Sequence, residues 1–222
     1  MKKIWIGILI ACGPLLPVSA QDVQGTSITV AVENAKYVFS CNGASGAQSI
    51  AVSLLEAHGG DQRLVGPQRL DDADDCSQVT WTTQPASESG AQLVMANPGQ
   101  LGLNAQMLVY YADKDGVEFS GYLPVAADTL TPGQFRVVGA DAYGEWERTY
   151  AFKNHKLNVA QELLLVQSGT VCVERSGTVK TNLPCAGSTI KASAKSPVCV
   201  IQQDGRATLA ASRTCSSLTL RR

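Results

Sequence analysis

Histidine, aromatic residues and the common catalytic motifs are scarce or missing in this chain. Only 6% of its 222 residues are aromatic, and its two histidines, His58 and His155, lie far apart in the sequence. It has no Gly-x-Ser-x-Gly elbow, no His-Glu-x-x-His and no Cys-x-x-Cys. These are the usual signatures of serine hydrolases and zinc sites. We therefore expect no catalytic residue, no metal and no cofactor, and we expect both histidines at exposed turns.

Long hydrophobic runs are also missing. No segment approaches 18 uninterrupted apolar residues, so we expect no transmembrane segment. The first 20 residues instead resemble a signal peptide, with Lys2 and Lys3, a short apolar stretch at 4–11 and the cleavage site Val18-Ser19-Ala20. We expect cleavage after Ala20 and residence in the bacterial periplasm or outside the cell. An alternative is a lipid anchor on Cys12, because residues 9–12 resemble a lipobox.

Cysteine, by contrast, occurs at seven positions, six of them after residue 20. An even number of cysteines in an exported chain predicts disulfides, because that compartment oxidises thiols. Six cysteines allow 15 pairings, and we expect neighbours to pair. The predicted bridges are Cys41–Cys76, Cys172–Cys185 and Cys199–Cys215.

Charge is unevenly distributed along the chain. Residues 21–128 contain 13 acidic and 4 basic residues, a net charge of −9. Residues 129–222 contain 6 acidic and 12 basic residues, a net charge of +6. The two halves could attract each other, or the acidic half could attract a basic protein partner such as a secreted enzyme. Neither half is basic enough to indicate nucleic-acid binding.

Alternation of polar and apolar residues predicts an antiparallel, all-β protein. Residues 50–58 fit a helix or a strand, and we favour a strand. Asp113-Lys114-Asp115-Gly116 predicts a hairpin turn, and residues 145–174 predict a meander of three strands. The expected fold is a meander, propeller-like or sandwich sheet domain with a small disulfide-rich β subdomain. Strands are expected at 26–32, 37–41, 77–83, 106–112, 117–123, 145–153, 156–166 and 170–174.

Composition changes near residue 167. Beyond it, four of the six later cysteines fall within a span of 44 residues, and no aromatic residue follows Phe152. Such a segment has little apolar surface to bury, so disulfides would have to replace a core. We therefore expect a β domain at 21–166 and a cysteine-rich C-terminal subdomain or extension at 167–222.

The densest charge lies directly before Cys76. Asp71, Asp72, Asp74 and Asp75 repel one another and need solvent or a counter-charge. The alternatives are a solvated loop, a protein-binding acidic patch and a calcium site, although the spacing of a calcium loop is absent. If the protein acts by binding, we expect these four carboxylates to contribute through long-range attraction.

A second candidate for protein binding is the segment at residues 141–148. It combines Tyr143 and Trp146 with several charged residues at the start of an expected strand. Interfaces favour tyrosine, tryptophan and arginine. The alternative is that Trp146 packs in the core.

The stretch from Met107 to Cys172 resembles the integrin-like, FG-GAP-related β proteins of bacterial envelopes. The resemblance rests on the Asp113–Gly116 turn, on Gly-Tyr-Leu-Pro at 121–124, on Trp-Glu-Arg-Thr-Tyr-Ala-Phe at 146–152 and on Lys-Leu-x-x-x-x-Glu-Leu at 156–163. It covers about a third of the chain. Some members of that group are immunity proteins that block peptidoglycan hydrolases. This chain lacks the group's calcium loop with three aspartates and adds the cysteine-rich tail.

These patterns together predict a non-catalytic, exported binding protein. Its most concrete form is an inhibitor or immunity protein for a secreted effector such as a peptidoglycan hydrolase. The alternative is a structural or adhesive component of the envelope or of a surface apparatus. An envelope hydrolase is the third possibility, and it has the least support in the sequence.

Overall fold

The computed structural model describes most of the chain after the expected signal peptide. The described ranges are 21–24, 26–44, 46–56, 63–71, 75–86, 90–101, 104–180 and 185–219. The expected signal peptide, including Cys12, lies outside them, as do His58, Asp72 and Asp74. Within the described ranges, no helix is long and apolar enough to cross a membrane.

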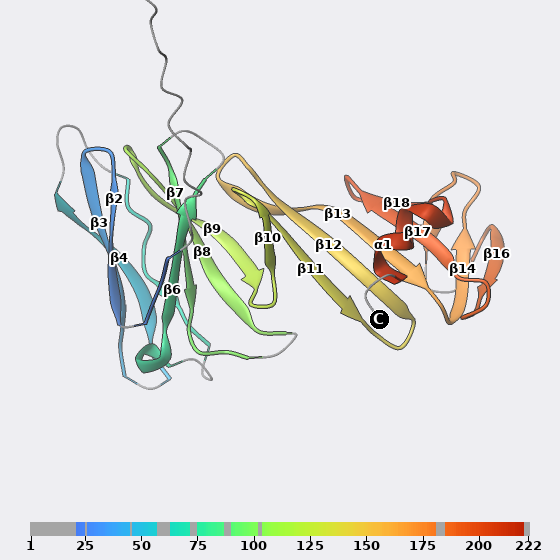
Figure 1. The fold of residues 1–222 in the computed structure, drawn as a ribbon, viewed down its shortest axis with the longest axis horizontal. Helices are drawn as coiled ribbons and strands as arrows, with labels where there is room; N and C mark the ends of the chain where they lie inside the picture. Colours follow the sequence, from blue (N-terminus) through green and yellow to red (C-terminus); the bar gives the residue numbers. More distant parts are fainter. Residues whose placement is uncertain are drawn as a thin grey trace, which may run out of the picture.

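The protein is all-β and antiparallel, and its four sheets form an elongated molecule (Figure 1). Its N-terminal part is a sandwich of two sheets, which we call the N-terminal sandwich. The five-stranded sheet has the order β1 (Gln21–Gln24), β6 (Thr80–Pro85), β7 (Gln92–Asn97), β8 (Gln106–Asp113) and β9 (Gly116–Pro124). The four-stranded sheet has the order β2 (Ser27–Val32), β3 (Ala35–Asn42), β4 (Ser49–Glu56) and β5 (Gln68–Arg69).

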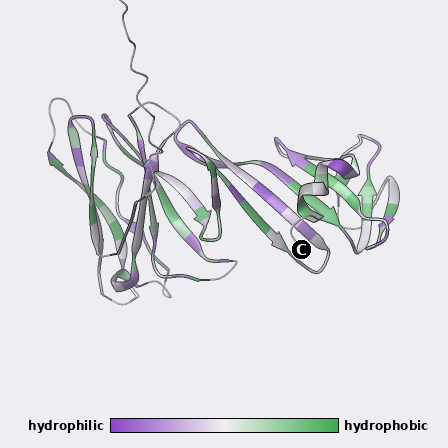
Figure 2. Ribbon diagram, viewed as in Figure 1, coloured by the Kyte–Doolittle hydropathy of each residue, from purple (hydrophilic) through white to green (hydrophobic). Residues whose placement is uncertain are grey.

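The core of the sandwich follows from alternation along its strands. In β3 every second side chain is buried, and Tyr37 and Phe39 are fully so. Phe39 contacts Trp81 and Tyr110 of the facing sheet, with ring centroids 6.3 and 5.4 Å away. Hydrophobic and hydrophilic residues alternate along the strands (Figure 2), as a sheet with one buried face requires.

The C-terminal part also contains two sheets. The six-stranded sheet has the order β10 (Asp128–Thr131), β11 (Gln134–Ala140), β12 (Gly144–Lys153), β13 (Lys156–Val166), β17 (Val198–Gln203) and β18 (Arg206–Leu209). The three-stranded sheet has the order β15 (Val179–Lys180), β14 (Gly169–Val173) and β16 (Ser188–Ala192). A short helix, α1 (Ser216–Thr219), follows a 3₁₀ turn at Ser212–Cys215 and packs through Leu218 on one face of the six-stranded sheet.

The expected strands are present, with two differences, and nine further strands in the described part of the chain, including β7 and β11, were not expected. Residues 76–78 form a 3₁₀ turn, so the strand expected at 77–83 starts only at Thr80. The expected three-strand meander stops after β13, because β14 pairs with β15 and β16 in another sheet. The place beside β13 is taken by β17. The six-stranded sheet therefore contains strands from both sides of residue 167.

Three disulfides join neighbouring cysteines, as the sequence predicted. Cys41–Cys76 lies in the N-terminal sandwich, and Cys199–Cys215 ties β17 to the 3₁₀ turn before α1. Cys172–Cys185 ties β14 to the segment before β16. Three disulfides are typical of a protein that folds outside the cytoplasm.

The hairpin of β12 and β13 connects the two parts of the molecule (Figure 1). Near its tip, Tyr150, Phe152 and Leu157 pack on the outer face of the five-stranded sheet. Asn154 and His155, with φ of 53° and 58°, form the tight turn. The expectation of an exposed turn histidine is wrong for His155. Its ring stacks on Tyr111 of β8 with centroids 4.0 Å apart, because the tip rests on the sandwich.

Candidate functional site

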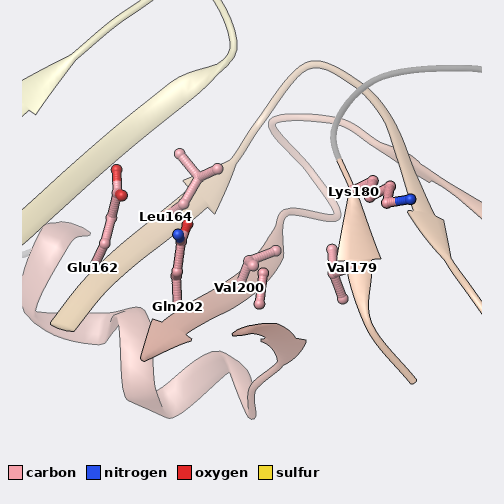
Figure 3. Close-up of a pocket in the computed structure, with 7 residues that line it drawn as sticks. Glu162, Leu164, Val179, Lys180, Val200 and Gln202 are labelled. Atoms are coloured by element: carbon pink, nitrogen blue, oxygen red, sulfur yellow. The ribbon is translucent and has the colours of Figure 1, made fainter. Parts of the chain in front are cut away.

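A cavity of about 370 Å³ opens between the two C-terminal sheets (Figure 3). We call it the inter-sheet cavity. One wall is the six-stranded sheet and the other is the short strand β15, which lies next to β18. Its lining residues come from four strands: Glu162 and Leu164 (β13), Val179 and Lys180 (β15), Val200 and Gln202 (β17) and Ala207 (β18).

Strand register explains why these side chains meet. Leu164 is paired with Val200, while Gln202 lies between Glu162 and Ala207 on the neighbouring strands. Paired residues in adjacent strands point to the same face of a sheet. The apolar members of the lining pack with Val179 of the facing sheet in one small hydrophobic cluster. Because β15 contains only two residues, it covers only part of this face.

The charged residues at the rim are already paired. Glu162 Oε1 accepts hydrogen bonds from Nη2 and Nε of Arg148, at 3.0 and 3.1 Å. Burial lowers the pKa of Arg148, but the hydrogen bond and the charge of Glu162 outweigh it, so the net shift is upward. Lys180 pairs with Glu174, and its ammonium points away from the other labelled side chains (Figure 3). The floor of the cavity is thus apolar and its rim is nearly neutral.

Trp146 extends the same face of the sheet beyond the cavity. It is paired with Leu164 on one side and with Gly139 on the other. A Cβ at residue 139 would lie 2.3 Å from Trp146 Cζ2, so glycine is required where the ring crosses the strand. The Arg148 guanidinium lies 4.9 Å from the ring centroid, a cation–π contact. Trp146 is therefore partly buried. This is intermediate between the two alternatives that the sequence left open, a side chain packed in the core and a side chain exposed at an interface.

Tyr143 lies apart from the cavity lining. It is 63% exposed, in the turn between β11 and β12. Asp141 Oδ1 accepts hydrogen bonds from the backbone amides of Tyr143 and Gly144, which fixes the turn. Neither Tyr143 nor Trp146 is among the residues that line the inter-sheet cavity.

The described members of the acidic cluster have separate surroundings. Asp71 is exposed and lines another pocket, beside Arg69 and Tyr122. Asp75 caps the 3₁₀ turn that carries Cys76, and its Oδ1 accepts a hydrogen bond of 2.9 Å from the Ser77 amide. This bond lowers the pKa of Asp75. Asp75 thus has a local structural role that the sequence alone did not indicate.

The Asp75 cap predicts a small pH dependence of stability. Because its pKa is lowered in the folded state, the carboxylate stabilises the fold above the unfolded pKa of about 3.9, and this contribution is lost as the pH falls through the folded pKa. We expect Asp75→Asn to be less stable than the wild type at pH 6 and to approach it at pH 3. Urea unfolding at both pH values measures the difference. A difference that is equal at both values would contradict the prediction.

Sequence patterns did not indicate most residues of the inter-sheet cavity as candidates for a site. Its lining comes from segments as far apart as Glu162 and Ala207. In the chain, β13 and β17 are separated by the three strands of the other sheet, β14 to β16, and yet they pair. Within the described ranges, no group of three or more His, Cys, Asp and Glu residues is placed to hold a metal ion.

Comparison with known proteins gives one distant structural likeness. No family model matches the chain, and no curated protein matches it. A solved structure described as "Structure of a Xanthomonas Type IV Secretion System related protein" shares 12% sequence identity with it. The alignment covers 83% of this chain and 93% of that one, with a TM-score of 0.38. A likeness at this level does not establish a common fold or family.

Proposed function

We propose that this chain is a non-catalytic, exported binding protein that receives an apolar side chain of a protein partner in the inter-sheet cavity. The observation that carries the proposal is a preformed cavity with an apolar floor and an ion-paired rim. Its volume of about 370 Å³ is at the low end of the range of about 300–1,000 Å³ for ligand pockets. That size suits one inserted side chain better than a large cofactor.

The surroundings of the cavity support protein binding. Binding energy at interfaces concentrates in buried pockets flanked by tryptophan, tyrosine and arginine. Trp146 and Arg148 lie beside the cavity on the same face of the sheet, and both are held by contacts within the protein. A partner would therefore meet a surface that loses little side-chain freedom on binding.

The more specific form of the proposal is an inhibitor or immunity protein for a secreted peptidoglycan hydrolase. Its support is the resemblance of residues 107–172 to envelope proteins that include such inhibitors. The net charge of −9 in residues 21–128 would speed association with a basic enzyme, because opposite potentials steer the encounter. The three disulfides suit a compartment where such enzymes act.

A cavity-filling substitution tests this proposal. We expect purified wild-type protein to slow peptidoglycan hydrolysis by envelope extract of the source bacterium and to form a complex with the enzyme. Ala207→Trp fills the cavity and should weaken that complex by about 10–100-fold, equivalent to about 1.4–2.8 kcal/mol. Ala160→Trp is the matched control, because Ala160 is an exposed bulge residue of the same sheet with no partner in β12.

The outcomes separate the two parts of the proposal. If the wild-type protein neither slows hydrolysis nor binds a hydrolase, the inhibitor function is wrong. If it binds but Ala207→Trp binds equally well, the inter-sheet cavity is not the site. Melting temperatures of both variants check that a loss of binding is not a loss of folding.

A further inference from the structure

A second pocket lies at the open edge of the N-terminal sandwich, far from the inter-sheet cavity in the sequence. Its volume is about 280 Å³, and we call it the Tyr122 pocket. It forms where β9 is an edge strand and where the facing sheet ends in the two-residue strand β5. Its lining residues are Arg69, Leu70, Asp71, Gln100, Asn104, Gln106, Leu108 and Tyr122.

Tyr122 presents an aromatic ring to solvent in a fixed position. It is 51% exposed, although it lies in β9 opposite the buried Leu108. The ring of Phe119 meets it edge to face, with centroids 5.2 Å apart and an angle of 75° between the planes. Phe119 in turn packs against the buried ring of Tyr110. The exposed ring is thus supported by the core and does not have to be ordered when a ligand binds.

The rest of the lining is mostly polar and planar. Asp71 supplies carboxylate acceptors, Arg69 supplies guanidinium donors, and the amides of Gln100, Asn104 and Gln106 supply both. Some of these groups already bond within the protein: Arg69 Nη2 donates to Gly46 O at 3.2 Å, and Gln100 Oε1 accepts from the backbone N–H of Gln106 at 3.4 Å. These bonds hold the side chains in place.

We propose that the Tyr122 pocket binds one sugar ring of an oligosaccharide. A pyranose ring has an apolar C–H face that packs against an aromatic ring, and hydroxyl groups that both donate and accept hydrogen bonds. The Tyr122 ring and the surrounding amide, carboxylate and guanidinium groups match these two halves of the ligand. A volume of about 280 Å³ accommodates one ring, and the open edge lets the rest of the glycan continue into solvent.

Other ligand classes fit this lining less well. An apolar ligand would desolvate most of the polar groups without replacing their hydrogen bonds. An anion such as phosphate would meet the Asp71 carboxylate as well as Arg69.

A buried polar group lies nearby as well. The hydroxyl of Tyr110 has no hydrogen-bond partner within the described part of the chain, and burial raises its pKa, with a smaller effect from Tyr122.

Isothermal titration with chitotetraose, cellotetraose, maltotetraose and a soluble peptidoglycan disaccharide-peptide tests the proposal. We expect the wild-type protein to bind at least one of these probes, and Tyr122→Ala to weaken that binding at least tenfold. Tyr122→Phe should retain most of the affinity, because it keeps the ring. Tyr143→Ala is the matched control: Tyr143 is even more exposed than Tyr122 but lies in the C-terminal part, and its loss should leave the affinity unchanged.

Two results would overturn the glycan pocket. One is that none of the four probes binds the wild-type protein. The other is that Tyr122→Ala, with an unchanged melting temperature, binds as tightly as the wild type. Neither result depends on the inter-sheet cavity or on a hydrolase partner, so this inference and the proposed function fail separately.

Discussion

Replacing Trp81 with alanine is expected to lower the free energy of unfolding by about 3–5 kcal/mol, the largest effect of any single side chain considered. Trp81 is 0% exposed and is the largest of the fully buried side chains. It packs against Phe39 across the two sheets of the N-terminal sandwich, so its removal would leave a cavity that both sheets line. Urea unfolding of the wild type and of Trp81→Ala measures the change.

Trp146→Ala is the matched comparison for this variant. Trp146 is only partly buried and covers Gly139 at the sheet surface, so we expect its loss to cost about 1–2 kcal/mol. An equal cost for the two substitutions would show that Trp146 is a core residue, and it would weaken the case for a binding surface around it.

Removing the Cys199–Cys215 disulfide is expected to cost about 3 kcal/mol. The bridge spans 16 residues, and a loop of about this length loses roughly that much conformational entropy in the unfolded chain. It also anchors the 3₁₀ turn and α1, which cover Leu163 and Leu165. In a Cys199→Ala/Cys215→Ala variant, denaturant unfolding should show the loss, and amides of β13 should exchange hydrogen faster.

The Cys172–Cys185 bridge provides the control for that experiment. It spans 13 residues, so its entropic contribution is similar, but it ties β14 to the segment that leads into β16 of the same three-stranded sheet. Its removal should lower stability without a selective increase of exchange in β13. Equal exchange of β13 in both double-alanine variants would mean that α1 does not depend on its disulfide.

Local patterns were sufficient to predict nine of the 18 strands in the described part of the chain, the hairpin at 113–116 and the disulfides, because alternation and close cysteine spacing are properties of short segments. The pairing of β17 with β13 was not predictable in this way, since it joins strands separated by a whole three-stranded sheet. The inter-sheet cavity depends on that pairing, so its lining residues could not be predicted from local patterns. Asp75 caps a turn through the Ser77 amide, and His155 stacks on Tyr111. Residue spacing in the sequence does not specify either partner, so neither role was predicted.

The hairpin of β12 and β13 also sets how rigid the molecule is along its length. Bending at the short link between β9 and β10 would require Tyr150, Phe152 and Leu157 to leave the five-stranded sheet and His155 to separate from Tyr111. These contacts oppose bending between the two parts of the molecule, one of which contains the Tyr122 pocket and the other the inter-sheet cavity. A ligand bound in the N-terminal sandwich would therefore stay at nearly the same distance from a ligand bound between the C-terminal sheets.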